Sequence, residues 1–167
     1  MSSTTTIATR RAAEESILSG VVVPIASVEY TAVNFRDFYR SMINVARPVP
    51  TDIAGGGHGH IYLLEDHANY TTRTGGVDWI EAVRPGPLDL TGVTTNAGIA
   101  RAKETRTAAL EAHNTQEGAR TGLRKKIIAN TPRALFVALE DADSLLDEVE
   151  PRVLMAALKA RAAPVTV

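Results

Sequence analysis

The chain has 167 residues, a formal net charge of −1 and no cysteine. Its length suits a single domain with a hydrophobic core, its charge gives no overall field to attract nucleic acid or an anionic membrane, and without cysteine neither disulfides nor thiolate metal sites can form. Aromatic residues make up only 5% of the chain, and alanine is frequent instead. Small side chains favour close helix packing but bury little surface, so we expect a domain that gains stability from its neighbours.

The N-terminal segment predicts an arm with little regular core structure. Met1–Ala8 is rich in Ser and Thr and predicts a disordered tail, or an arm that orders on contact with another molecule. Arg10–Leu18 has the composition of a short helix, which Gly20 ends. Val21–Ile25 is rich in β-branched residues, and Pro24 restricts it to an edge strand or an extended arm.

The same segment contains no recognisable targeting or membrane-spanning signal. The apolar run Ile17–Val28 is interrupted by Ser, Gly and Pro, and it is too short to cross a bilayer. Arg10 and Arg11 are followed by acidic residues instead of the apolar stretch of a secretory signal. We therefore expect a cytoplasmic protein without a membrane partner.

The middle of the chain predicts two helices separated by glycine-rich turns. Apolar residues recur three and four positions apart over Thr31–Ala46 and predict a helix capped by Thr31. Gly55–Gly57 predicts a turn, because three glycines cost too much backbone entropy inside a regular element. A short helix is predicted over Asp66–Thr72, and the irregular connection after it carries Trp79, the only tryptophan.

The C-terminal half is the most strongly helical part. A helical pattern begins at Thr94 or Thr95, and we expect Gly118 and Gly122 to break or bend it. Further on, Pro132 is expected to open another helix at its favoured first-turn position, with Thr131 as the cap. A last helix is predicted from Glu150–Pro151 to just before Pro164.

These elements predict an all-α fold, a small helical bundle with a glycine-rich insertion and an extended N-terminal arm. We divide the chain into an arm with a short helix (1–29), a helical domain (30–163) and a tail (164–167). At most one short strand is expected, near Val21–Ile25 or Ile61–Leu64, since no segment shows the alternation of a strand.

The sequence GGGHGH at 55–60 is the most suggestive chemical motif. Two histidines separated by one residue share a face of a strand, so His58 and His60, with His67 or Asp66, match a small metal-dependent enzyme. The helical HExxH spacing of many zinc enzymes is absent. We favour the alternative, a structural turn that docks the Trp79 connection onto the bundle without a metal.

Other catalytic patterns are missing from the sequence. The glycine loop matches neither phosphate-binding motif, and no lysine follows it. There is no GxSxG nucleophile, and the acidic run over 140–150 lacks the glycine and spacing of an EF-hand. We expect no catalytic residue, no metal and no cofactor, so that the protein is not an enzyme.

A basic cluster is the remaining candidate site. It consists of four residues: Arg120, Arg124, Lys125 and Lys126. Arg120 and Arg124 share a helix face, which suits contact with the phosphates of RNA or DNA. Two alternatives remain open: a solvated helix end whose positive charges interact favourably with the helix dipole, or an interface between copies that uses the acidic run downstream.

Several segments, in order, resemble the Gag-like capsid region of copia-type LTR retrotransposons of algae, diatoms and oomycetes. The helix over Phe35–Ala46 precedes a PVPT connection, and the sequence GGGHGHIYL is similar to that family's GGGxHGHLxL block. The spacing of Trp79 and of His113 also matches. Near the end, the segment from Pro132 to Leu158 is similar to a closing TPxxLLxHL pattern.

The resemblance covers about Tyr30 to Ala163, and it implies assembly of many copies into a shell or filament around nucleic acid. It identifies no catalytic residue. The chain has no CxxC-type zinc knuckle, the family's usual RNA-binding module. A separate capsid-type protein and a part of a longer precursor both remain open.

We therefore expect a structural, self-assembling coat or capsid protein in virus-like particles. Self-association is expected through the apolar residues of the arm: Val21, Val22, Val23 and Ile25. Such a run is too apolar to stay in water, and its burial by an adjacent copy is worth on the order of a few kcal/mol. Deletion of Met1–Ile25 is expected to leave a folded domain that no longer assembles. The alternatives are the metal-dependent enzyme and a monomeric nucleic-acid-binding module.

Overall fold

The computed structural model describes residues 2–25, 30–51, 58–140 and 146–162, and within them it contains helices and irregular connections but no strand. The predicted all-α fold is confirmed. The elements are α1 (Ser2–Leu18), α2 (Ala32–Ala46), the 3₁₀ helix η1 (Ile61–Leu63), α3 (His67–Thr74), α4 (Asn96–Ala129), the 3₁₀ helix η2 (Arg133–Leu139) and α5 (Pro151–Arg161). The predicted turn at Gly55–Gly57 and the tail (164–167) lie outside the described residues.

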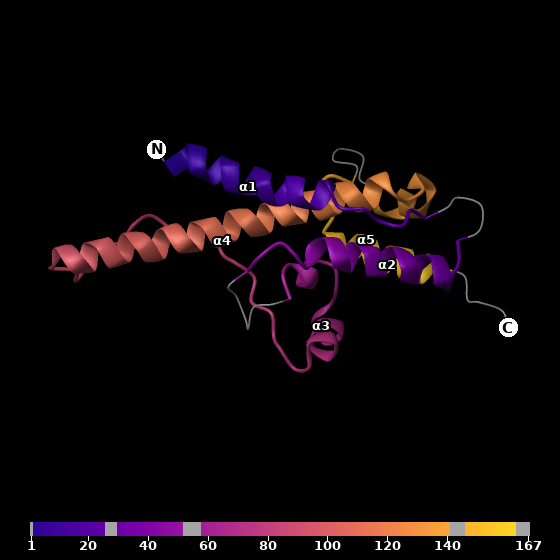
Figure 1. Cartoon of the computed structure of the whole chain (residues 1–167), viewed down its shortest axis with the longest axis horizontal. Coiled ribbons are helices and arrows are strands. Elements are labelled where there is room, and N and C mark those ends of the chain that lie inside the picture. Colours follow the sequence, from indigo (N-terminus) through magenta and orange to yellow (C-terminus); the bar gives the residue numbers. More distant parts are fainter. Residues whose placement is uncertain (1, 26–29, 52–57, 141–145, 163–167) are drawn as a thin grey trace.

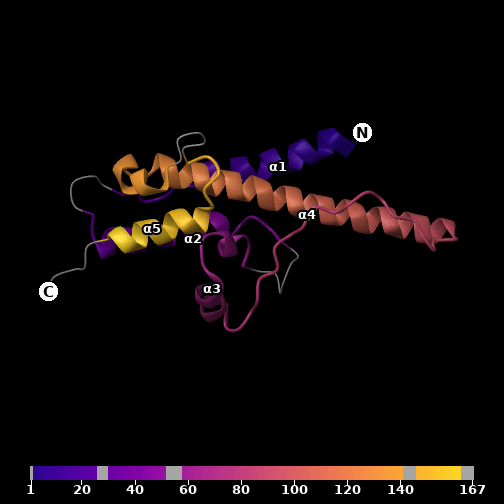
Figure 2. The ribbon, with the colours of Figure 1, turned by 180° about the vertical axis from the view of Figure 1, so that it is seen from behind.

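The longest element is α4, which extends well beyond the other helices at one end (Figures 1 and 2). Its 34 residues span about 51 Å at 1.5 Å per residue. Thr95 is its N-cap, and the Thr95 hydroxyl accepts a hydrogen bond from the Gly98 amide at 3.0 Å. No residue of α4 before Asn114 is buried. Only the C-terminal half of this helix therefore belongs to the core.

Helix α1 packs along this C-terminal half, and the contact is the most extensive between any two helices described. The two helices run in the same direction (Figure 1). Gly118 lies against Arg10, Gly122 against Glu14, and the Lys126 ammonium binds the Leu18 carbonyl oxygen at 2.8 Å. The contacts advance four residues at a time along both helices, as expected for a parallel pair.

Gly118 and Gly122 do not break or bend α4, contrary to expectation, because their role is to admit α1. A Cβ atom on Gly118 would overlap the backbone carbonyl of Arg10. A Cβ atom on Gly122 would lie 3.1 Å from the Glu14 carbonyl oxygen, which is tight but not overlapping. Small residues at a helix contact let two backbones approach closely, and packing against α1 compensates for the poor helix propensity of glycine.

The short helix predicted over Arg10–Leu18 is present, but it begins earlier than expected. Helix begins at Ser2, within the segment predicted to be a tail, and Ile17 is fully buried against α4. After α1, the backbone amide of Ile25 donates a 2.9 Å hydrogen bond to Asn130, and the Ile25 side chain is also buried. Deletion of Met1–Ile25 would remove these core residues, so it cannot separate folding from assembly.

The other helices close the core around the end of α4. The predicted Thr31 cap is confirmed, since its hydroxyl accepts from the Asn34 amide in a capping box. Asp66 caps α3, and its carboxylate accepts a hydrogen bond from the Asn69 amide at 2.8 Å. The largest fully buried apolar side chains come from α1, α2, the segment at η1, the C-terminal half of α4, η2 and α5: Ile17, Phe38, Met42, Ile61, Leu63, Leu64, Leu123, Ile127, Phe136, Leu154 and Leu158.

The segment after Pro132 differs from the prediction. Arg133–Leu139 forms a 3₁₀ helix, and Pro132 is its cap. The Thr131 hydroxyl donates backwards, to the Ile127 carbonyl oxygen at 2.7 Å. This hydroxyl is therefore used to satisfy the open C-terminal end of α4 and not to cap the next helix.

A substitution pair tests the close contact of α1 and α4. Gly118→Ala is expected to destabilise the fold by about 1–3 kcal/mol, because overlap with the Arg10 carbonyl outweighs the gain in helix propensity of about 1 kcal/mol. Gly122→Ala makes the same chemical change where neighbours need to shift by only a few tenths of an ångström, and it should be nearly neutral. Urea unfolding of both variants measures the difference; equal effects would contradict the contact.

Candidate functional site

The His-Gly-His turn joins the end of α2 to the core. Gly59 has a φ of 55°, and a Cβ atom there would overlap the Arg47 carbonyl. The His60 amide donates to the Ala46 carbonyl at 3.0 Å, and its buried ring nitrogen Nδ1 lies 2.9 Å from the Val49 carbonyl oxygen. The turn therefore occupies the C-terminal end of α2 and hydrogen-bonds to its backbone.

An aromatic cluster follows the turn and surrounds Trp79. Ring centroids lie 5.1 Å from Trp79 for His67, 5.5 Å for Tyr70 and 6.0 Å for Tyr62. The Arg152 guanidinium stacks over the same indole at 4.8 Å. The turn positions Tyr62, and Tyr62 contacts Trp79, so the block contributes to docking the Trp79 connection as expected.

The histidines proposed for a metal enzyme have separate partners. His60 faces Val49, the His67 Nε2 lies 2.8 Å from an Asp78 oxygen, and the His58 ring contacts Tyr70 edge-on. Within the described ranges, no three His, Asp or Glu side chains are grouped to hold a metal ion. The predicted ligand set is therefore not brought together in this part of the structure.

Gln116 fastens the strap, which we define as residues 77–93, to α4. The Ala82 amide donates to the Gln116 Oε1 at 2.7 Å, and the Gln116 Nε2 donates to the Ala82 carbonyl at 3.1 Å. The Tyr62 hydroxyl also donates to this Oε1, at 2.8 Å. The buried side-chain amide thus satisfies both backbone groups of Ala82, as a neighbouring strand would do in a sheet. Sequence reasoning missed Gln116, because a lone polar residue in a polar helix gives no signal.

The predicted basic cluster is bound up in contacts within the chain. Arg120 is largely buried and forms ion pairs with Glu117, Glu81 and Glu150. The Arg124 Nε donates to the Val149 carbonyl at 2.7 Å.

Two lysines of the cluster reach α1. Lys125 pairs with Glu14, and Lys126 binds the Leu18 carbonyl oxygen at the end of that helix. A cation at a helix C-terminus interacts favourably with the dipole. The cluster therefore has a role in folding, and nucleic-acid binding by it stays a prediction.

The predicted self-association residues divide into two groups. Val21 is 90% exposed and Val23 is 51% exposed, whereas Val22 is half-buried and Ile25 is buried in its own chain. The Val23 amide donates to the Ser41 hydroxyl at 3.0 Å. The segment thus lies against α2, and only two of its four apolar side chains are free for another molecule.

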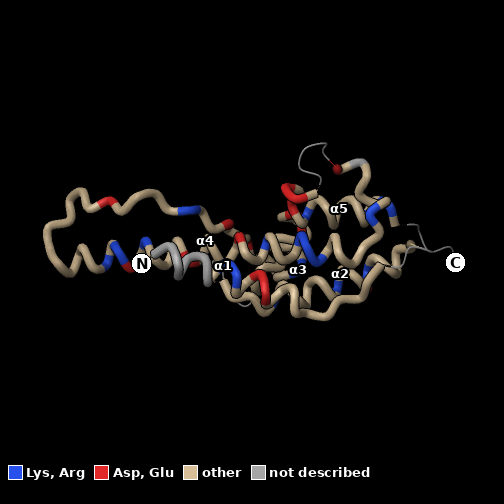
Figure 3. The backbone as a smooth tube through the Cα atoms, turned by 90° about the horizontal axis from the view of Figure 1, so that it is seen from above, with Lys and Arg blue, Asp and Glu red and all other residues tan. Residues whose placement is uncertain are grey.

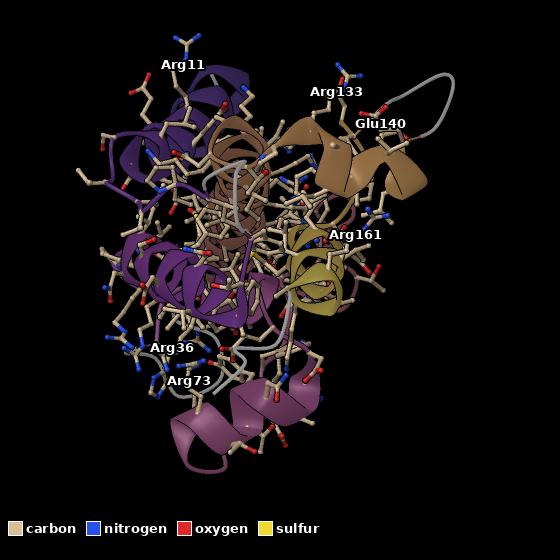
Figure 4. The ribbon with its side chains drawn as sticks, turned by 90° about the vertical axis from the view of Figure 1, so that its right-hand side faces the viewer. Arg11, Arg36, Arg73, Arg133, Glu140 and Arg161 are labelled. Atoms are coloured by element: carbon tan, nitrogen blue, oxygen red, sulfur yellow. The ribbon has the colours of Figure 1, made fainter. Side chains whose placement is uncertain are left out.

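A groove of about 670 Å³ lies between α2, α3 and α5. Phe35, Tyr39 and Met155 line it with apolar surface, and Arg73 lies between α2 and α3 (Figure 4). At its base, the Glu65 Oε1 accepts from the Tyr39 hydroxyl and from Arg73. Burial and the neighbouring Glu65 carboxylate raise the pKa of Tyr39, so this hydroxyl keeps its proton.

The second oxygen of this carboxylate, Glu65 Oε2, is buried and has no hydrogen-bond partner among the described residues. A buried carboxylate oxygen without a donor costs free energy. The groove has the size of a small-molecule site, and its chemistry suits a ligand that donates N–H or O–H. However, the Glu65 side chain is fully buried, so a ligand would reach it only if the groove opened.

Within the described part of the chain, the contacts of the N-terminal half of α4 lie on one side. The strap lies there, with the Arg106 Nε donating to the Gly86 carbonyl at 2.9 Å. Pro87 and Leu88 help to line a shallow hollow of about 500 Å³ against the helix. The opposite side of the helix is exposed to solvent from Ala97 to Ala108.

Comparison of the chain with models of known protein families, with curated proteins and with solved structures gives no match. Among the helices described, none combines the length and the apolar character that crossing a membrane requires.

The Gln116 clamp gives a prediction for the strap. Gln116→Leu leaves the Ala82 amide and carbonyl without partners and is expected to destabilise the fold by about 2 kcal/mol. Gln116→Glu keeps the acceptor for Ala82 and Tyr62 but loses the amide donor, so its effect should be intermediate. Hydrogen exchange at the Ala82 amide, followed by mass spectrometry, should accelerate most in the leucine variant. Unchanged protection would show that other contacts hold the strap.

Burial of His60 predicts a pH dependence of stability. Burial lowers the pKa of His60 below its ordinary 6.5, because the imidazolium would lose its hydration. The unfolded chain then binds a proton more readily, so the free energy of unfolding is expected to fall as the pH decreases below about 6.5. Burial lowers the pKa of His113 in the same direction. Urea unfolding at pH 7.5 and 5.5 tests this, and His60→Gln should reduce the difference between the two pH values. An undiminished difference in that variant would assign the effect to other groups.

Proposed function

We propose that this protein is a structural subunit that assembles with copies of itself, as a coat or capsid protein that encloses nucleic acid. The observation that carries the proposal is the projecting part of α4 before Leu110, which no other helix described covers. Isolated helical segments of this length are marginal in water, and most helical stability in proteins comes from packing. A second molecule that packs on this segment would supply that stability.

Two further observations support assembly. Val21 and Val23 expose apolar surface beside α2, which another copy would remove from water. The segments that resemble the Gag-like capsid region also fall on structural features here, since the His-Gly-His block is a turn at the end of α2 and Trp79 lies in an aromatic cluster. A capsid subunit needs such a rigid body to present its contact surfaces.

We also propose that the protein is not an enzyme. The polar residues that a catalytic reading would use are engaged in structural contacts: His60 with Val49, Gln116 with Ala82, and Arg120 with three carboxylates. The Glu65 groove supports a second, less favoured candidate, the binding of a small molecule with a hydrogen-bond donor.

Light scattering after size exclusion tests the proposal directly. The mass of the subunit is 17.9 kDa, and we expect a larger mass that increases with protein concentration. Electron microscopy of the same fractions is expected to show particles or filaments. Absorbance at 260 nm above that of the protein alone would identify enclosed nucleic acid. A constant mass of one subunit at every concentration would overturn self-assembly.

A further inference from the structure

The exposed face on the N-terminal half of α4 has a definite composition. Six residues fall on one side of the helix at spacings of three and four: Ala97, Ala100, Arg101, Glu104, Thr107 and Ala108. All six are exposed, and Arg101 also borders the hollow at the strap, where Gly98, Ala102 and Ala109 on the other side of the helix are partly covered. The face is therefore made of small side chains around one basic and one acidic residue.

This face continues the surface on which α1 packs. Gly118 and Gly122 lie on the same side of α4 and receive α1. By the register of these contacts, Ser2 at the start of α1 lies opposite Leu110. The part of the face before Leu110 is therefore not covered by α1.

The charges on the face lack an ion-pair partner among the residues that the structure describes. Neither Arg101 nor Glu104 forms an ion pair among the described residues, whereas Arg106, turned toward the strap, binds Gly86. Figure 3 shows basic and acidic residues close together along this projecting end. When two copies of such a face meet, opposite charges face each other only if the two helices are suitably oriented.

We propose that this end of α4 pairs in antiparallel orientation with the same segment of a second copy of this chain. In this register Arg101 of each copy faces Glu104 of the other, and Ala97 faces Ala108. A parallel pair would instead place Arg101 against Arg101 and Glu104 against Glu104, which like-charge repulsion opposes. The antiparallel contact is isologous, so it closes with two-fold symmetry.

The length of the exposed face fits this occupant. In this register the N-terminal end of the second copy's α4 reaches the start of α1 of the first copy. Together, α1 and the second α4 cover one side of the first α4 along its whole length. The contact area is below the roughly 1,200–2,000 Å² of a stable interface, so the pair is weak by itself and becomes strong only when other contacts, such as those at Val21, act together with it. The inference rests on the proposed self-assembly and names one of its contacts.

Charge exchange in the full-length chain tests the register. Arg101→Glu and Glu104→Arg are each expected to weaken self-association about tenfold or more, because both facing pairs become repulsive. An equimolar mixture of the two variants should recover association, since each charge then faces its opposite. The double variant Arg101→Glu/Glu104→Arg should recover it alone. Sedimentation velocity over a range of concentrations measures all four samples, and high salt should weaken the wild-type contact.

Arg36→Glu is the matched control. Arg36 is exposed on α2, which lies away from the projecting end of α4 (Figure 1), and its reversal changes the net charge by the same amount as Arg101→Glu. We expect it to leave association unchanged. The double variant keeps the wild-type net charge, and it decides the question if a single variant is poorly folded by circular dichroism.

The outcomes separate this contact from the broader proposal. If the wild type associates but both single reversals behave like Arg36→Glu, the α4 pairing is wrong while self-assembly stands. If the reversals weaken association and neither the mixture nor the double variant recovers it, the antiparallel register is wrong. If the wild type stays monomeric at every concentration, both the pairing and the proposed function fail.

Discussion

The close approach of α1 to Gly118 of α4 is the contact on which the rest of the structure depends. The Arg10 carbonyl occupies the space that a Cβ atom would take, so the two backbones meet directly at this point. The contact fixes the register of α1, which in turn places Ile17 in the core and Leu18 at Lys126. It also determines which half of α4 is covered and which half is not.

Hydrogen bonds from buried polar side chains hold several segments of this domain in place. Gln116, His60 and Glu65 are all buried. Gln116 binds the backbone of the strap at Ala82, His60 binds the backbone at Val49, and Glu65 joins Tyr39 of α2 to Arg73 of α3. Such bonds are directional, so they specify one position for the strap and the turn, where apolar packing alone would permit several. Burial also raises the pKa of Tyr30 to about 12, and its hydroxyl binds the Leu158 carbonyl, which joins the start of α2 to α5.

The sequence was informative wherever local chemistry determines the structure. The cap at Thr31, the short helix that starts at Asp66, the helix near Thr95 and the last helix at Pro151 all followed from residues within one turn of the feature. The errors concern long-range contacts. Gly118 predicts a break when α4 is considered alone, and only the presence of α1, more than a hundred residues away in the chain, turns it into a packing site. The Ser/Thr-rich start of α1 predicts disorder for the same reason.

The candidate sites show the same division between local and distant information. The composition of the basic cluster was evident, but its partners, Glu81, Glu150 and Glu14, come from three separate parts of the chain. The spacing of the histidines suggested that they could bind one metal ion together. In the structure, His60 instead binds the Val49 carbonyl and His67 lies against Asp78. Gln116 carries no motif at all, and its importance depends on the strap that lies beside it.

The parallel pairing of the first helix with a late one has a consequence for synthesis. Leu18 binds Lys126, which leaves the ribosome 108 residues later. At about 5–20 residues per second, α1 waits on the order of 5–20 s for its partner. During this interval the apolar side of α1 is accessible to chaperones and to other nascent chains on the same message.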